Sequence, residues 1–162
     1  MAKRTKKSNE PKTTAERLGS VIKSCRQIMR KDKGLSGDLD RLPLLTWVMF
    51  LKFLDDLEQI EESRAKMRGS KYRPTIESPY RWRDWAAQEN GVTGPELIAF
   101  INQEEATRPD GTKGPGLFAY LSGLHNGPTS RKRVIASVFS RLTNRIQSGY
   151  ILRDVINQVT SI

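Results

Sequence analysis

Cysteine, histidine and long apolar runs are scarce in this 162-residue sequence, and each scarcity excludes a class of protein. One cysteine allows no intramolecular disulfide, which excludes a secreted, disulfide-stabilised scaffold. One histidine, with no second histidine or cysteine at ligand spacing, offers no zinc site. The longest apolar run, residues 44–51, is far shorter than the roughly 20 residues of a membrane helix. Since the N-terminus also lacks the apolar stretch of a signal peptide, we expect a soluble, cytoplasmic protein.

The sequence shows no catalytic constellation either. His125 stands next to an Asn-Gly pair, which favours a role at a helix end or in a loop over catalysis. Cys25 lies on an apolar helix face, which predicts a buried core thiol. The acidic residues between positions 55 and 62 point in several directions on a helix. They therefore predict a solvated face rather than a metal site.

Basic residues outnumber acidic residues by 28 to 18, which gives a formal net charge of +10 and a pI of about 10.0. A charge of this size suggests a polyanionic partner, most often nucleic acid. The positive charge is concentrated in four segments: 1–17, 18–37, 64–85 and 129–146. The regions 38–63 and 86–128 are acidic. Such a patchy distribution favours a docking surface over uniform solubilisation.

Two basic clusters are candidates for contact with the phosphates of double-stranded DNA. Arg131, Lys132 and Arg133 fall in the first turn of a predicted helix, whose N-terminal amides also favour anions. The second cluster interleaves cations with aromatic residues: Lys71, Arg73, Arg81 and Arg83 with Tyr72, Tyr80, Trp82 and Trp85. Such a mixture can grip phosphates or stack on bases. Each cluster has an alternative. The cations of the first would form a solvated face, and the tryptophans of the second would anchor the short helix in the core.

Apolar residues recur at spacings of three and four along most of the chain, which predicts helices. We expect them at about 14–33, 38–62, 82–89, 94–105, 117–126, 129–146 and 150–159, with Thr14 as the first N-cap. Residues 67–81 and 106–116 are rich in glycine and proline and predict irregular loops. Residues 44–51 are apolar on nearly every side, which is typical of a helix buried at the centre of a bundle. The predicted fold is all-α: a compact bundle of six or seven helices around that central helix, spanning 14–162 after a basic flexible tail at 1–13.

Three stretches carry a resemblance to a known family. They are AERLGSVIKSCRQIMRKDKGLSGDLD at 15–40, RLPLLTWVMFLKFLDDLEQ at 41–59 with its core at 48–56, and SGYILRDVIN at 148–157. In this order and spacing they resemble the N-terminal helical domain of the DNA-methyltransferase (modification) subunit of type I restriction–modification systems. The resemblance extends over nearly the whole chain from Ala15 onward.

The resemblance implies a helical domain that precedes a Rossmann-like catalytic domain. In the family that second domain binds S-adenosylmethionine and methylates adenine at N6, with FxGxG-type and NPPF-type motifs. Neither motif occurs here, so no catalytic, cofactor-binding or metal-binding residue is carried over to this chain. The implied partners are double-stranded DNA, the specificity subunit, a second modification subunit and the restriction subunit.

The first hypothesis is therefore a non-catalytic N-terminal domain of an adenine-N6 DNA methyltransferase subunit. It would help to clamp the DNA backbone and to assemble the specificity and modification subunits, while base flipping occurs in the catalytic domain. The alternative is a protein–protein adaptor without direct DNA contact. A small independent enzyme is disfavoured, because no catalytic constellation is present.

Overall fold

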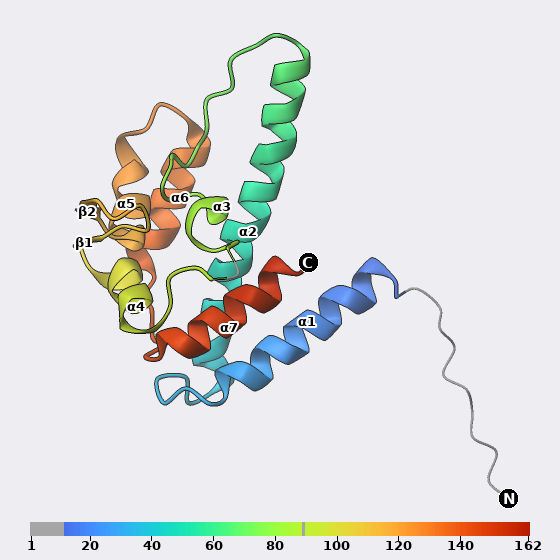
Figure 1. Ribbon diagram of the computed structural model, residues 1–162, viewed down its shortest axis with the longest axis vertical. Coiled ribbons are helices and arrows are strands. Elements are labelled where there is room, and N and C mark those ends of the chain that lie inside the picture. Colours follow the sequence, from blue (N-terminus) through green and yellow to red (C-terminus); the bar gives the residue numbers. More distant parts are fainter. Residues whose placement is uncertain (1–11, 89) are drawn as a thin grey trace, which may run out of the picture.

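The computed structural model describes residues 12–88 and 90–162. Of the predicted basic tail at 1–13, only Lys12 and Thr13 fall within these ranges. The described residues form the elements α1 Thr14–Met29, α2 Asp38–Met67, α3 Trp82–Trp85, α4 Gly94–Asn102, β1 Glu105–Thr107, β2 Lys113–Pro115, α5 Leu117–Ser122, the 3-10 helix η1 Gly123–Asn126, α6 Ser130–Arg141 and α7 Gly149–Thr160. The predicted all-α class is confirmed, and Figure 1 shows the other helices gathered around the long α2.

The structure corrects several predicted boundaries. Thr13, not Thr14, is the N-cap of α1. Its hydroxyl accepts a hydrogen bond from the Glu16 amide at 3.2 Å, and the Glu16 carboxylate accepts one from the Thr13 amide at 2.7 Å. Helix α3 ends at Trp85 and helix α6 at Arg141, both earlier than expected. Residues 106–116, predicted to be a loop, contribute to a short antiparallel hairpin in which Ala106 pairs with Gly114. Its strands of three residues are too short to show an alternating pattern.

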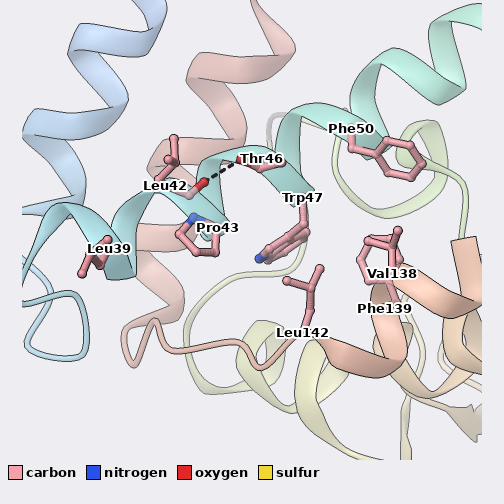
Figure 2. A pocket seen from close by; sticks show the side chains of 9 residues that line it. All are labelled: Leu39, Leu42, Pro43, Thr46, Trp47, Phe50, Val138, Phe139 and Leu142. Atoms are coloured by element: carbon pink, nitrogen blue, oxygen red, sulfur yellow. Dashed lines mark hydrogen bonds between the residues drawn. The ribbon is translucent and has the colours of Figure 1, made fainter.

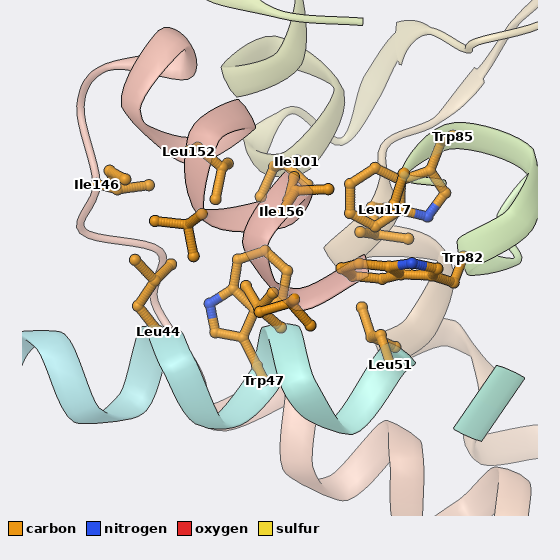
Figure 3. Close-up of a cluster of buried hydrophobic side chains, with 14 of the residues drawn as sticks. Leu44, Trp47, Leu51, Trp82, Trp85, Ile101, Leu117, Ile146, Leu152 and Ile156 are labelled. Atoms are coloured by element: carbon orange, nitrogen blue, oxygen red, sulfur yellow. The ribbon is translucent and has the colours of Figure 1, made fainter. Parts of the chain in front are cut away.

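The core lies between the lower half of α2 and helix α7. Figure 3 shows Trp47 and Leu51 of α2 facing Leu152 and Ile156 of α7, with Trp82 and other buried side chains closing the cluster. Helix α1 packs against the other side of α7, where Cys25 is fully buried. The upper half of α2 projects beyond this core, and the chain after it returns in the connector that leads to α3 (Figure 1). Among the described residues, no helix is both long and apolar enough to cross a bilayer.

Arg153 of α7 organises the turn after α3. Its buried guanidinium has no carboxylate partner among the described residues, and it donates to the backbone carbonyls of Trp85, Ala86, Gln88 and Val92 at 2.8–3.3 Å. Burial lowers the pKa of Arg153, but an arginine stays protonated in proteins. The side chain therefore replaces the backbone partners that this irregular segment lacks.

Asp32 performs a similar task between helices α1 and α2. Its buried carboxylate accepts bonds from the amides of Gly34 at 2.8 Å, Gln147 at 3.1 Å and Ser148 at 2.8 Å. The turn between α1 and α2 and the turn before α7 are thereby joined through one side chain.

Candidate functional site

The acidic stretch on α2 is only in part the solvated face that the sequence predicts: Glu62 is exposed and Asp56 is half-buried. The side chains of Asp55 and Glu58 are buried, with only 4% and 1% of their surface exposed. Asp55 binds the guanidinium of Arg83 at 2.9 Å, and Glu58 accepts a bond from the Thr75 amide at 2.6 Å. These acids therefore fix the returning connector against the projecting half of α2.

Three of the seven predicted phosphate-binding residues have carboxylate partners within the chain. Arg83 also reaches Glu62 at 3.2 Å, and Arg81 binds Asp84 through two bonds at 2.9 and 3.0 Å. Arg131 binds Glu61 through two bonds at 3.0 and 3.2 Å, and these hold the pKa of Glu61 below its ordinary value. A paired guanidinium has fewer donors left for a phosphate, so these three are weaker candidates than the sequence suggests.

Of the other four predicted residues, Lys71, Arg73 and Arg133 are exposed and Lys132 is half-buried. Within 12–88 and 90–162, none of Lys71, Arg73, Lys132 and Arg133 lies within ion-pair distance of a carboxylate. Glu61 brings their two segments together, because it accepts bonds from both Tyr72 and Arg131. We call these four cations the distal basic surface, since they lie near the projecting end of α2.

The aromatic residues of the second cluster belong to the core. Trp82 and Trp85 are buried with their ring centroids 5.4 Å apart, and Tyr80 is buried against Tyr120. This confirms the alternative in which the tryptophans anchor the short helix. They are not available to stack on bases.

Helix α1 carries a second basic surface, which the candidate clusters did not include. The exposed cations of α1 and of the turn that follows it, none with a carboxylate partner among the described residues, are Arg17, Lys23, Arg30, Lys31 and Lys33, which we call the α1 basic surface. The signal was present in the sequence, because residues 18–37 hold five basic residues and one acidic residue. Only the three-dimensional structure shows that these cations differ from Arg83 and Arg131, which pair with acids of α2 far away in the sequence.

An apolar groove lies between α2 and α6. It has a volume of about 490 Å³ and is lined by Leu39, Leu42, Pro43, Thr46, Trp47, Phe50, Val138, Phe139 and Leu142. Figure 2 shows that all but Val138, Phe139 and Leu142 come from the first half of α2. Within the predicted stretch 44–51, Thr46 and Phe50 are exposed and the other residues are buried or half-buried, so this part of α2 is buried on most of its sides but not on all. Before this stretch, Leu39 and Leu42 are 91% and 65% exposed. One face of α2 packs in the core, and the described residues leave the opposite face, which is apolar, exposed.

The remaining chemical groups have structural roles. His125 is exposed, and its Nδ1 lies 3.1 Å from the Ser122 carbonyl at the end of α5, which agrees with the helix-end prediction. In the ranges that the structure covers, no group of three or more histidine, cysteine or acidic residues is placed to hold a metal ion.

Cys25 is expected to resist thiol reagents in the folded protein. Burial raises the pKa of its thiol to about 11, so both access and thiolate content are low near neutral pH. Labelling with an aromatic disulfide reagent at pH 8 should be negligible in buffer and stoichiometric in denaturant. Rapid labelling in buffer would show that α1 separates from α7 in the native state.

Comparisons with known proteins agree with one another. Residues 18–159 match the HsdM N-terminal domain family. The type I restriction enzyme EcoEI methylase subunit of Escherichia coli is 35% identical over 147 residues, which is 90% of this chain and 27% of that subunit. A crystal structure of a modification subunit assigned to a type I restriction enzyme from Vibrio vulnificus YJ016 is 61% identical with a TM-score of 0.90, over 96% of this chain and 32% of that one.

A second solved structure concerns complex assembly and conformational transition of the type I R-M system. It is 33% identical to this chain, with a TM-score of 0.70, and the match covers 93% of this chain and 27% of that one. The chain thus spans about a third or less of the length of each relative.

Proposed function

The chain belongs to the HsdM N-terminal domain family of type I modification subunits. From that premise we propose a function with two halves: the chain binds the DNA backbone, and it helps to assemble the methylase. The DNA half rests on one observation: some cations are paired with carboxylates, whereas others, gathered in the two basic surfaces, are not. Acids of α2 neutralise the arginines near them, whereas the distal and α1 basic surfaces keep their charge. Unpaired surface cations contact phosphates without reading the bases.

The assembly half is supported by the apolar face of α2 and by the relative described in terms of complex assembly. The proposed protein partners are the specificity subunit, a second modification subunit and the restriction subunit. Adenine-N6 methylation, with S-adenosylmethionine as the methyl donor, is proposed for a separate catalytic domain of such a subunit, acting in the cytoplasm. This chain would position the DNA for that reaction and increase the affinity of the subunit for DNA.

Neutralising either basic surface is expected to weaken DNA binding and flatten its salt dependence. One variant changes the distal residues Lys71, Arg73, Lys132 and Arg133 to Gln, and the other changes the α1 residues Arg17, Lys23, Arg30 and Lys31 to Gln. If all four cations of a set contact phosphates, the slope of log affinity against log salt should fall by about three to four, because each contact contributes about 0.9. Binding to duplexes of unrelated sequence across about 50–200 mM salt measures this slope.

The control removes two exposed cations that lie outside both surfaces, Lys113 and Arg141. It should change the slope much less per charge removed. Equal slopes for the wild type and both quadruple variants would contradict the DNA half of the proposal. Retention of the specificity subunit without retention of DNA would instead favour the adaptor hypothesis.

A further inference from the structure

The carboxylate of Glu61 is shared by the two segments that carry the distal basic surface, the connector after α2 and the start of α6 (Figure 1). Tyr72 donates to Glu61 Oε2 at 3.1 Å, and Arg131 donates to Oε2 at 3.0 Å and to Oε1 at 3.2 Å. An arginine binds a phosphate through the same two parallel bonds. We propose that Glu61 occupies the position of a DNA phosphate and that a bound duplex displaces it from Arg131. The inference rests on the DNA half of the proposed function and names where one phosphate binds.

The unpaired cations near this carboxylate favour the exchange. The two donors to Glu61 stand within two sequence positions of all four cations of the distal basic surface. For Arg131, the exchange replaces one anion by another. For the four cations, a duplex adds phosphates where the described residues provide no carboxylate. The net gain in affinity therefore comes from the unpaired cations, and the pair between Glu61 and Arg131 opposes it only weakly.

The exposure of the pair allows it to open. The side chains of Arg131 and Glu61 are 40% and 33% exposed, and an exposed ion pair contributes little to stability. The pair between Arg83 and Asp55 differs, because the Asp55 side chain is only 4% exposed. Opening that pair would leave a buried carboxylate without its charged partner. Arg131 can therefore turn to a phosphate, whereas Arg83 keeps its structural role.

The rest of the site stays in place when Glu61 leaves. The buried carboxylate of Glu58 accepts a bond from the Thr75 amide at 2.6 Å, which ties the connector to α2 independently of Glu61. Burial and the nearby carboxylates of Glu58 and Glu61 raise the pKa of Tyr72, so its phenol stays protonated. The phenol can then donate to the incoming phosphate as it donates to Glu61. The exchange therefore needs side-chain movement only.

Glu61→Gln tests the exchange, because it keeps the size of the side chain and removes the charge that holds Arg131. The affinity of the 162-residue chain for a short duplex, measured by fluorescence anisotropy at about 100 mM salt, should rise about three- to fivefold. That gain is the upper end of what the release of an exposed ion pair contributes. An affinity equal to or below that of the wild type would overturn the proposal.

Glu105→Gln is the matched control. It makes the same chemical change at an exposed residue of strand β1, outside both basic surfaces, and Glu105 has no ion-pair partner among the described residues. Its effect on the affinity should stay below about 1.5-fold, because salt screens charges that lie far from the bound phosphates. Equal gains for the two variants would show that any lost negative charge suffices, and the exchange would be wrong.

Arg131→Gln tests the other partner of the pair. It should lower the affinity and flatten the slope of log affinity against log salt by about 0.9, because one phosphate contact is lost. Arg141→Gln removes an exposed arginine from the same helix and should flatten the slope much less. Equal slopes for these two variants would overturn the proposal. Circular dichroism should show all four variants folded.

Nitrogen-15 NMR of the arginine side chains observes the exchange in the wild-type chain. The Nε–H signal of Arg131, identified by its loss in Arg131→Gln, should shift when the duplex is added and also when Glu61 is replaced. Both changes remove its carboxylate partner. The signal of Arg83 is the internal control and should not respond, because its bond to Asp55 stays closed. An Arg131 signal that ignores the bound duplex would overturn the exchange whatever the variants show.

The two proposals fail in different ways. If the distal quadruple variant flattens the salt slope but Glu61→Gln brings no gain and the Arg131 signal does not shift, the exchange is wrong and the DNA half of the proposed function stands. If the wild-type chain retains no duplex even at low salt, the DNA half is wrong and the exchange falls with it.

Discussion

Replacing Arg153 by methionine is expected to lower the free energy of unfolding by about 3–5 kcal/mol, because it leaves buried carbonyls without donors. The guanidinium bonds four backbone carbonyls of the segment from Trp85 to Val92, and the flexible apolar chain of methionine can fill the space but donates nothing. Urea unfolding followed by circular dichroism gives the value, provided that the slope of the transition is unchanged.

Two further variants separate hydrogen bonding from charge at this position. Arg153→Lys keeps the positive charge but lacks the planar fork, so it should recover only part of the lost stability. Arg141→Met removes an exposed arginine from α6 and should stay within about 0.5 kcal/mol of the wild type. If Arg153→Met were as stable as Arg141→Met, the carbonyl cluster would not depend on this side chain.

Adding one methyl group at Gly149 is expected to cost about 3 kcal/mol or more. A Cβ built on Gly149 would overlap the carbonyl oxygen and carbonyl carbon of Gly94, both of them backbone atoms that cannot rotate away. The first residues of α4 and α7 must therefore separate to admit the group, which loosens the packing behind them. Thermal unfolding of Gly149→Ala should show a large decrease in melting temperature.

Gly19 provides the matched control for this substitution. It lies inside α1, where an added Cβ meets nothing within 4 Å. Gly19→Ala should raise the free energy of unfolding by about 1 kcal/mol, since alanine is the better helix former. A similar loss in both variants would show that the contact between Gly94 and Gly149 is not the cause.

The sequence predicts the helices well because each one buries a continuous face. Cys25 and Met29 of α1 are in the core together with most of the periodic residues of α7. The Ser148 cap of α7 coincides with the predicted break at Ser148-Gly149. Composition could not show which faces of α2 are covered. A helix that is apolar all round predicts burial, but it does not predict which of its sides the other helices cover. The packing of α6 and α7 decides that.

The candidate site was harder to predict, because charge counts along a sequence do not record pairing in space. Asp55 and Arg83 are 28 positions apart, and Glu61 and Arg131 are 70 apart. Segment totals place these residues in separate acidic and basic regions, whereas the fold neutralises one with the other. The α1 basic surface shows the opposite outcome: its segment is basic in the charge count, and within the described residues its five cations have no ion-pair partner.

The packing of α1 on α7 has a consequence for synthesis on the ribosome. The Cys25 thiol lies 4.0 Å from the Val155 carbonyl, across 130 positions of sequence. At a synthesis rate of about 5–20 residues per second, roughly 7–26 s pass between the synthesis of α1 and the synthesis of α7, the helix that covers it. During that interval the apolar face around Met29, which α7 covers in the folded protein, is open to solvent.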